Sequence, residues 1–145
     1  MANNKFSVNT ELIEGMKVKV SDNRGHEIII DEPESMGGTD EGMTPVEITL
    51  ASLAGCLSIT SAFLANKMNV EINNLSIDVE GEIDEKAMSS AEVDSGFKEI
   101  RYDLKIDSDS SEDKIKKLYQ SIEKYCPVSD TLEREIEVKG NLTSK

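Results

Sequence analysis

The chain has 145 residues, a length typical of one domain with its own hydrophobic core, and we expect a single domain over residues 1–145. With 16 basic and 29 acidic residues its net charge is -13, which repels phosphate backbones and anionic lipid headgroups. We therefore expect neither nucleic acid nor a membrane as a partner. The opening residues, MANNKFSVNT, lack the apolar stretch of a secretory signal, so we expect a cytoplasmic location.

Alternating apolar and polar residues predict three strands near the start of the chain, forming an antiparallel meander. The apolar positions are Phe6, Val8 and Leu12 in the first, Met16, Val18 and Val20 in the second, and Ile28 to Ile30 in the third, after a turn at 22–25. Residues 31–43, DEPESMGGTDEGM, are rich in acid and glycine and predict a loop that leads into a helix.

A helix is predicted from residue 44 to about residue 66. Thr44 is a suitable N-cap, Pro45 suits the first helical position, and Glu47 completes a capping box. The uncharged stretch 48–66 approaches membrane-spanning length, but it contains several hydroxyl residues and Gly55 at its middle. We therefore expect a helix enclosed by other elements of a soluble protein or an oligomer.

The second half of the chain predicts two long antiparallel strands, a helix, a short helix and a final strand. The strands carry their apolar residues at 75–83 and 100–106, joined by a polar connection at 89–95. Ser110 or Ser111 begins an amphipathic helix that ends at Cys126, because Pro127 follows. A short helical segment is expected from Pro127 to about Glu133, and the alternation of Ile136, Val138 and Leu142 predicts a last strand.

The two cysteines differ in their predicted surroundings. Cys56 lies deep inside the apolar helix, where a cysteine is usually a small hydrophobic residue and the helix dipole does not activate it. Cys126 precedes a proline at a helix junction, where free amides of the following turn can stabilise a thiolate, although an inert thiol at a helix end is equally compatible. No periodicity shows whether two residues 70 positions apart meet in space.

The remaining candidate ligands predict neither a metal site nor a cofactor. His26 is the one histidine, and together with two cysteines it falls short of a four-ligand zinc site. Gly37 and Gly38 lack the strand and helix context of a phosphate-binding loop. Two cysteines are also too few for a disulfide framework, which leaves a transient redox use open.

Two motifs resemble the cysteine motifs of the OsmC/Ohr superfamily: TPVEITLASLAGC at 44–56 and YCPVSDTL at 125–132. Their order and spacing, together with the predicted elements, extend the resemblance over nearly the whole chain. It implies an α+β fold in which antiparallel sheets wrap around a long central helix. It also implies an intertwined homodimer with the cysteine sites at the subunit interface.

The resemblance further implies thiol-dependent reduction of organic hydroperoxides. Cys56 would attack the peroxide and become a sulfenic acid, Cys126 would resolve it as a disulfide, and a dithiol such as a lipoylated protein would regenerate the pair. One position departs from the pattern. The peroxidase branches of the superfamily carry a glutamate ten residues before the first cysteine, and this glutamate orients an arginine against the thiolate. In this chain the same position is Val46. Arg24 is the best candidate for the thiolate-pairing cation, with Lys17 as a substitute.

Two other functions stay open. The first is a redox-responsive protein of the same fold that binds a small molecule or carries sulfur and has little peroxidase activity, which the Val46 departure favours. The second is a structural dimer with two inert thiols. Glu47 does not replace the missing carboxylate, because nine residues turn a helix by about half a revolution and point it away from Cys56.

Overall fold

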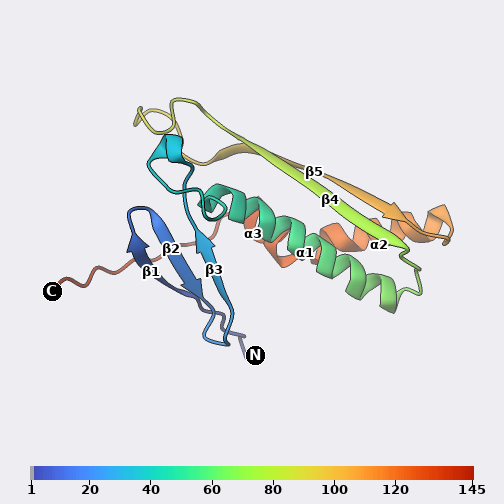
Figure 1. Cartoon of the computed structure of the whole chain (residues 1–145). Coiled ribbons are helices and arrows are strands. Elements are labelled where there is room, and N and C mark those ends of the chain that lie inside the picture. The colour runs from blue at the N-terminus through green and yellow to red at the C-terminus, as the bar shows by residue number, and fades with distance from the viewer. Residues whose placement is uncertain (1) are drawn as a thin grey trace. The chain divides into compact units, whose positions relative to one another are not determined.

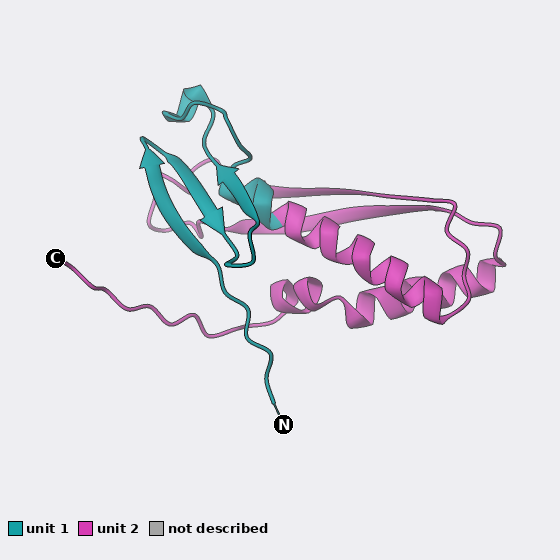
Figure 2. Cartoon of the chain, turned by 60° about the horizontal axis from the view of Figure 1, so that its bottom comes forward, with its two compact units in different colours: residues 1–49 teal, residues 50–145 magenta. Residues whose placement is uncertain are grey.

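The structure, a computed structural model that describes residues 2–145, consists of two compact units, Met1–Thr49 and Leu50–Lys145 (Figure 2). The expectation of a single domain over 1–145 stays a prediction. Figure 1 labels the elements, which are β1 (Asn9–Glu14), β2 (Lys17–Ser21), β3 (Glu27–Ile30), the short 3₁₀ helix η1 (Glu34–Met36), α1 (Pro45–Lys67), β4 (Asn74–Ile83), β5 (Phe97–Asp107), α2 (Glu112–Tyr125) and α3 (Pro127–Glu133).

Unit 1 contains the predicted antiparallel meander, with strand order β1-β2-β3. The turn between β2 and β3 uses Asn23 and Gly25 with positive φ, and the carboxylate of Asp22 accepts backbone N–H groups from Arg24 and His26. Among the described residues of this unit, Asp31 is the one buried side chain. The sheet therefore leaves apolar side chains of β1 to β3 exposed in this chain, among them Leu12 and Ile28.

The loop after β3 folds back onto the strand that precedes it. The Asp31 amide donates to the carbonyl of Met43 at 3.2 Å. A Cβ at Gly38 would overlap the carbonyl of Glu32, and one at Gly42 would overlap that of Ile29. Glycine is required at both positions because the two stretches of backbone approach so closely.

In unit 2, α1 buries one stripe of side chains, Leu53, Leu57, Ser61 and Ala65, at four-residue spacing. In the single chain another face of α1, with Ile59 and Phe63, lies exposed, so a helix enclosed by other elements of a soluble protein or an oligomer stays a prediction. By length and composition alone α1 would be able to cross a membrane. Its buried stripe instead belongs to a core shared with Leu118 and Ile122 of α2.

The strands β4 and β5 form the predicted antiparallel pair, with Leu75 opposite Ile106 and Ile77 opposite Leu104. Apolar side chains of both strands pack against the core, whereas the residues that alternate with them are polar or charged and mostly exposed. Arg101 lies on this charged face, where it forms ion pairs with Glu80, Glu82 and Glu99. The hairpin thus covers α1 and α2 with one face and meets solvent with the other (Figure 1).

The helices α2 and α3 begin and end where their sequence predicts. The Ser111 side chain accepts the amide of Lys114, which confirms Ser111 as the N-cap, and α3 occupies the predicted range. The final strand predicted at Ile136, Val138 and Leu142 is wrong for the single chain, since residues 135–145 form no strand. A strand needs a neighbour to satisfy its backbone N–H and C=O groups, and no described segment of this chain pairs with the C-terminal one.

Candidate functional site

The two cysteines meet in the core of unit 2. Cys56 comes from α1 and Cys126 from the junction between α2 and α3, and both are free thiols that pack in the same core, close enough for Cys56 to raise the pKa of Cys126. They belong to the same hydrophobic cluster, together with Leu53 and Leu57. The fold therefore brings side by side two sulfur atoms from positions that no sequence pattern relates.

Pro127 explains why Cys126 occupies this junction. A residue before proline is driven out of the helical region, and Cys126 adopts φ -77° and ψ 109°. Its amide still donates to the carbonyl of Ile122 at 3.1 Å, while its own carbonyl accepts the amide of Asp130 at 3.0 Å. Cys126 consequently ends α2 and starts α3, and its side chain points into the core.

Cys126 is sealed from solvent, with 0% of its surface exposed. Burial raises the pKa of its thiol above the ordinary value, and so does the neighbouring Cys56, while the backbone amides of Ser129 and Val128 act in the opposite direction. The backbone amides that follow Pro127 thus do act on the Cys126 sulfur as expected, but burial raises its pKa more than these amides lower it. Cys126 is a protonated thiol at neutral pH.

Cys56 is the more accessible of the pair, because it is half-buried whereas Cys126 is fully buried. Its sulfur lies 4.0 Å from the hydroxyl oxygen of Thr60, one helical turn further along α1. A small oxidant that enters the core of unit 2 from solvent reaches Cys56 first.

The three arginines and Lys17 have defined partners in the described chain. Arg24 forms an ion pair with Asp22 at 3.2 Å in unit 1, and 77% of its side chain is exposed. The Lys17 side chain is only 18% exposed and pairs with Glu41 in the same unit. In unit 2, Arg101 is held on the charged face of the hairpin and Arg134 pairs with Asp130. The structure thus places both candidate cations, Arg24 and Lys17, in unit 1 and both cysteines in unit 2.

The start of α1 confirms the capping box. The Thr44 amide donates to the carboxylate of Glu47 at 2.9 Å, and the Glu47 amide donates to the Thr44 hydroxyl at 3.3 Å. The Glu47 carboxylate is thereby bound to the backbone at the start of α1. Val46, ten residues before Cys56, is exposed and apolar, so it contributes no carboxylate at that position.

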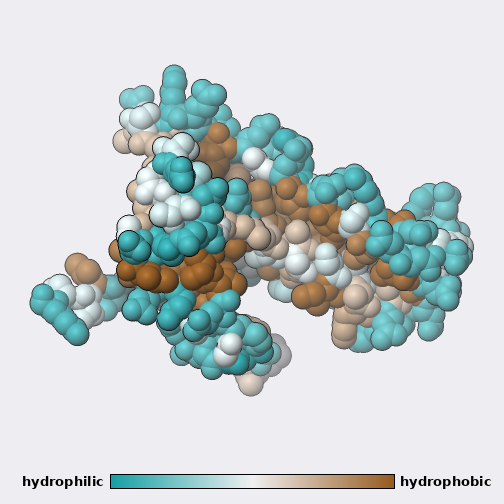
Figure 3. Space-filling view, viewed as in Figure 1, coloured by the Kyte–Doolittle hydropathy of each residue, from teal (hydrophilic) through white to brown (hydrophobic). Residues whose placement is uncertain are grey.

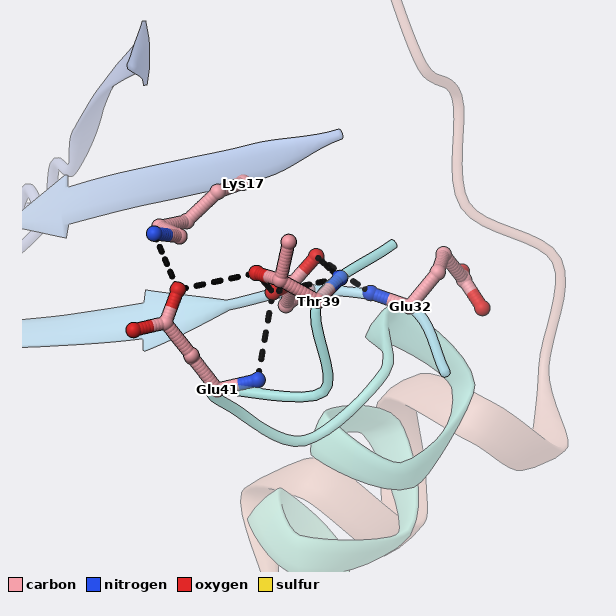
Figure 4. A network of polar contacts seen from close by, with 5 residues as sticks. Lys17, Glu32, Thr39 and Glu41 are labelled. Carbon is pink, nitrogen blue, oxygen red and sulfur yellow. Dashed lines mark hydrogen bonds and ion pairs between the residues drawn. The ribbon is translucent and has the colours of Figure 1, made fainter. Parts of the chain in front are cut away.

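A buried carboxylate that we did not expect from the sequence organises the loop 31–43 in unit 1 (Figure 4). Asp31 accepts the Thr39 hydroxyl at 2.7 Å, together with the amides of Glu32, Thr39 and Glu41. Glu41 in turn binds Lys17, and its carboxylate lies 2.8 Å from the Thr39 hydroxyl oxygen, whose single hydrogen the carboxylates of Asp31 and Glu41 share. The sequence does contain a signal for this network. Asp31 follows an apolar strand directly and precedes a glycine-rich loop, and an aspartate in such a position readily accepts hydrogen bonds from the amides of the loop.

This network makes a prediction about acid stability. The hydrogen bond from Thr39 lowers the Asp31 pKa from 3.8 to about 2, although burial opposes it. A carboxylate with a lowered pKa stabilises the fold fully above its unfolded value, and that contribution is lost as the pH falls from about 4 to about 2. We expect Asp31→Asn to lower stability at pH 7 and to flatten its decline in this pH range, as measured by urea unfolding at several pH values.

Asp40→Asn is the matched control for that prediction, because it removes one negative charge from an exposed residue of the same loop. Asparagine also tolerates the positive φ of Asp40. An equal loss of stability in both variants at pH 7, with equal slopes below pH 4, would contradict the assigned role of Asp31.

Over residues 2–145, no three side chains of His, Cys, Asp or Glu lie close enough together to hold a metal ion. His26, the histidine considered above, contacts Asp22 at 2.7 Å within the turn between β2 and β3. The cysteine site itself consists of two neighbouring thiols, of which Cys56 is half-buried and Cys126 is buried.

Comparison with known proteins places these features in context. A family model described as OsmC-like protein matches residues 38–141. A hydroperoxide reductase of Mycoplasma pneumoniae is 29% identical over 104 residues, which cover 72% of each chain. The crystal structure of an OsmC-like protein from Mycoplasma pneumoniae matches with a TM-score of 0.78 and 25% identity over 91% of this chain and 89% of that one. The organic hydroperoxide resistance protein OhrB of Bacillus subtilis shares the fold, with a TM-score of 0.58 and 21% identity over 94% of this chain and 96% of its own.

Proposed function

Because the chain belongs to the OsmC-like protein family, we propose that it is a thiol-dependent peroxidase that reduces organic hydroperoxides through Cys56 and Cys126. One observation carries the proposal: the two thiols are neighbours in the core of unit 2, and they differ in access. The hydroperoxide reductase of Mycoplasma pneumoniae supports the same class of activity. The apolar side chains around the pair suit an organic peroxide better than hydrogen peroxide.

The proposed cycle assigns different roles to the two sulfurs. The Cys56 thiol first gives its proton to solvent, and the thiolate attacks the distal peroxide oxygen. The O–O bond breaks, the departing alkoxide takes up a proton from solvent, and the products are a Cys56 sulfenic acid and an alcohol. The Cys126 sulfur then attacks the Cys56 sulfur, giving a disulfide and releasing water. A dithiol, such as a lipoylated protein, reduces the disulfide and returns both thiols. A cytoplasmic location suits this cycle because reductants there keep the resting cysteines reduced.

We assign Arg24 as the cation that stabilises the Cys56 thiolate. Its partner Asp22 is also bound by the amides of Arg24 and His26 and by the His26 ring, so Asp22 stays satisfied if the guanidinium moves away. Lys17 is a weaker candidate, because its half-buried amine is bound to Glu41 in the loop network. An Arg24→Gln protein that reacts with peroxide at the wild-type rate would remove Arg24 from the mechanism.

We further propose that the functional form is a homodimer. Apolar side chains are exposed in three regions of the single chain, which are the sheet of unit 1, one face of α1 and the C-terminal segment. Figure 3 shows hydrophobic residues along the surface over α1. A groove of about 610 Å³ runs along this helix and is lined by Ile59, Thr60, Phe63, Leu64, Lys67 and Tyr125. Monomeric soluble proteins rarely expose so much apolar surface, and pairing with a second copy would also satisfy the predicted last strand.

The proposed activity is tested by mixing the reduced protein with one equivalent of cumene hydroperoxide. We expect complete loss of both thiols and a single intramolecular bridge between Cys56 and Cys126, located by mass spectrometry of peptides. An equal amount of hydrogen peroxide is expected to react more slowly. The matched control is the Cys56→Ser protein, in which no bridge within the chain is possible.

The alternatives make different predictions in that experiment. A protein with inert thiols keeps both sulfurs reduced after an hour with either peroxide. A redox-responsive binding protein, which Val46 in place of a glutamate favours, oxidises slowly and to the same extent with both peroxides. Either result would contradict the peroxidase.

A further inference from the structure

Ser58, Ser61 and Thr60 lie close together in α1, but the hydroxyl of Thr60 differs from the other two in its neighbour. Serine and threonine inside helices usually donate back to the carbonyl four residues earlier. Ser58 does so to Ala54 at 2.8 Å, and Ser61 to Leu57 at 2.6 Å. The Thr60 hydroxyl oxygen instead lies 4.0 Å from a side-chain atom, the sulfur of Cys56, and either group can be the donor.

The position of Thr60 suits a role at the thiol. It lies four residues after Cys56, so the two side chains share one face of the helix. Both are half-buried, and Thr60 also lines the open groove along α1, whereas Cys126 is sealed in the core. The hydroxyl is therefore a polar group beside the more accessible of the two sulfurs.

We infer that Thr60 is a positioning residue for Cys56, whose hydroxyl donates to the Cys56 sulfur when that sulfur is a thiolate. The inference rests on the proposed function for its biological purpose. The physical argument is that a half-buried anion loses hydration and needs a donor, and a hydrogen bond to the charged form favours ionisation. A neutral hydroxyl on the same helix supplies this donor without a carboxylate at Val46.

The test measures the reactivity of Cys56 in a Cys126→Ser background, which removes the other thiol that faces it. Thr60→Val deletes the hydroxyl at nearly constant volume, and Thr60→Ser keeps the hydroxyl without the methyl group. We expect Thr60→Val to slow alkylation by iodoacetamide at pH 7 about two- to tenfold, which is the scale of an ordinary intramolecular hydrogen bond. The pH of half-maximal alkylation should rise, and Thr60→Ser should restore both values.

Ser58→Ala is the matched control, because it removes a hydroxyl from the same turn that is bound to backbone. It should leave the alkylation profile unchanged. Thr60→Ala serves as a second hydroxyl deletion if the valine variant does not fold, as judged by circular dichroism.

Three results would overturn the inference. One is an alkylation profile that neither Thr60→Val nor Thr60→Ala changes. Another is a Thr60→Ser protein as slow as Thr60→Val, which would show that the methyl group acts through packing. The third is an equal effect of Ser58→Ala. Failure of the peroxidase proposal would look different: the alkylation pattern would remain as expected while the protein with Thr60 intact failed to consume cumene hydroperoxide.

Discussion

Replacing Cys56 with serine is expected to lower catalysed turnover of cumene hydroperoxide at least about a thousandfold, since removing the nucleophile of an enzyme costs rate on this scale. Serine lacks the thiolate that attacks the peroxide, and Cys126 cannot substitute because it is fully buried with a raised pKa. The measurement is steady-state peroxide consumption with dihydrolipoamide as the reductant. Thermal unfolding of the same sample shows whether the fold is retained.

The Cys126→Ser protein is the informative partner of this variant. It should consume about one equivalent of peroxide at the wild-type initial rate and then stop, because the sulfenic acid at Cys56 has no neighbouring thiol to resolve it. Dimedone labelling followed by peptide mass spectrometry should locate the adduct at Cys56. An adduct on Cys126 in the Cys56→Ser protein, with wild-type consumption of peroxide, would reverse the two roles.

The elements of this fold could be predicted where a short local signal decides the structure. The capping box of Thr44 and Glu47 starts α1, and Ser111 starts α2. Pro127 separates α2 from α3, because proline acts on the residue directly before it. Each of these signals involves residues no more than four positions apart in the sequence. Each predicted the end of a helix to within about one residue.

Other features depend on partners far away in the sequence, and no local pattern contains them. The approach of Cys126 to Cys56 follows from how α2 packs on α1, and only the resemblance to a family pointed to it. The buried Asp31 depends on a loop that folds back onto its own strand. The predicted last strand shows the opposite case, in which a local pattern is present but the structure is not. Ile136 and Val138 alternate with charged residues as in a strand, but no strand in the described part of this chain pairs with this segment.

That missing partner leads to the prediction with the largest expected effect on assembly. We expect the wild-type protein to have about twice the mass of its 16.0 kDa chain in sedimentation velocity. Phe63 is 59% exposed on the apolar face of α1, where its ring also contacts the Lys67 amine. Phe63→Glu would place a carboxylate in the proposed apolar interface. Lys67, one turn further along α1, can pair with it, but dimerisation would then remove both charges from water, which costs several kcal/mol and should weaken the dimer at least about a hundredfold.

Met88→Glu is the matched control, since Met88 is 86% exposed in the connection between β4 and β5 and the change adds the same charge. It should leave the dimer intact. Because the groove beside Phe63 also contains Thr60, the neighbour of Cys56, dissociation should open the thiol to water and lower the rate with cumene hydroperoxide. A wild-type protein that sediments as a monomer at tens of micromolar, or a Phe63→Glu protein as dimeric as Met88→Glu, would rule out a second copy on this face of α1.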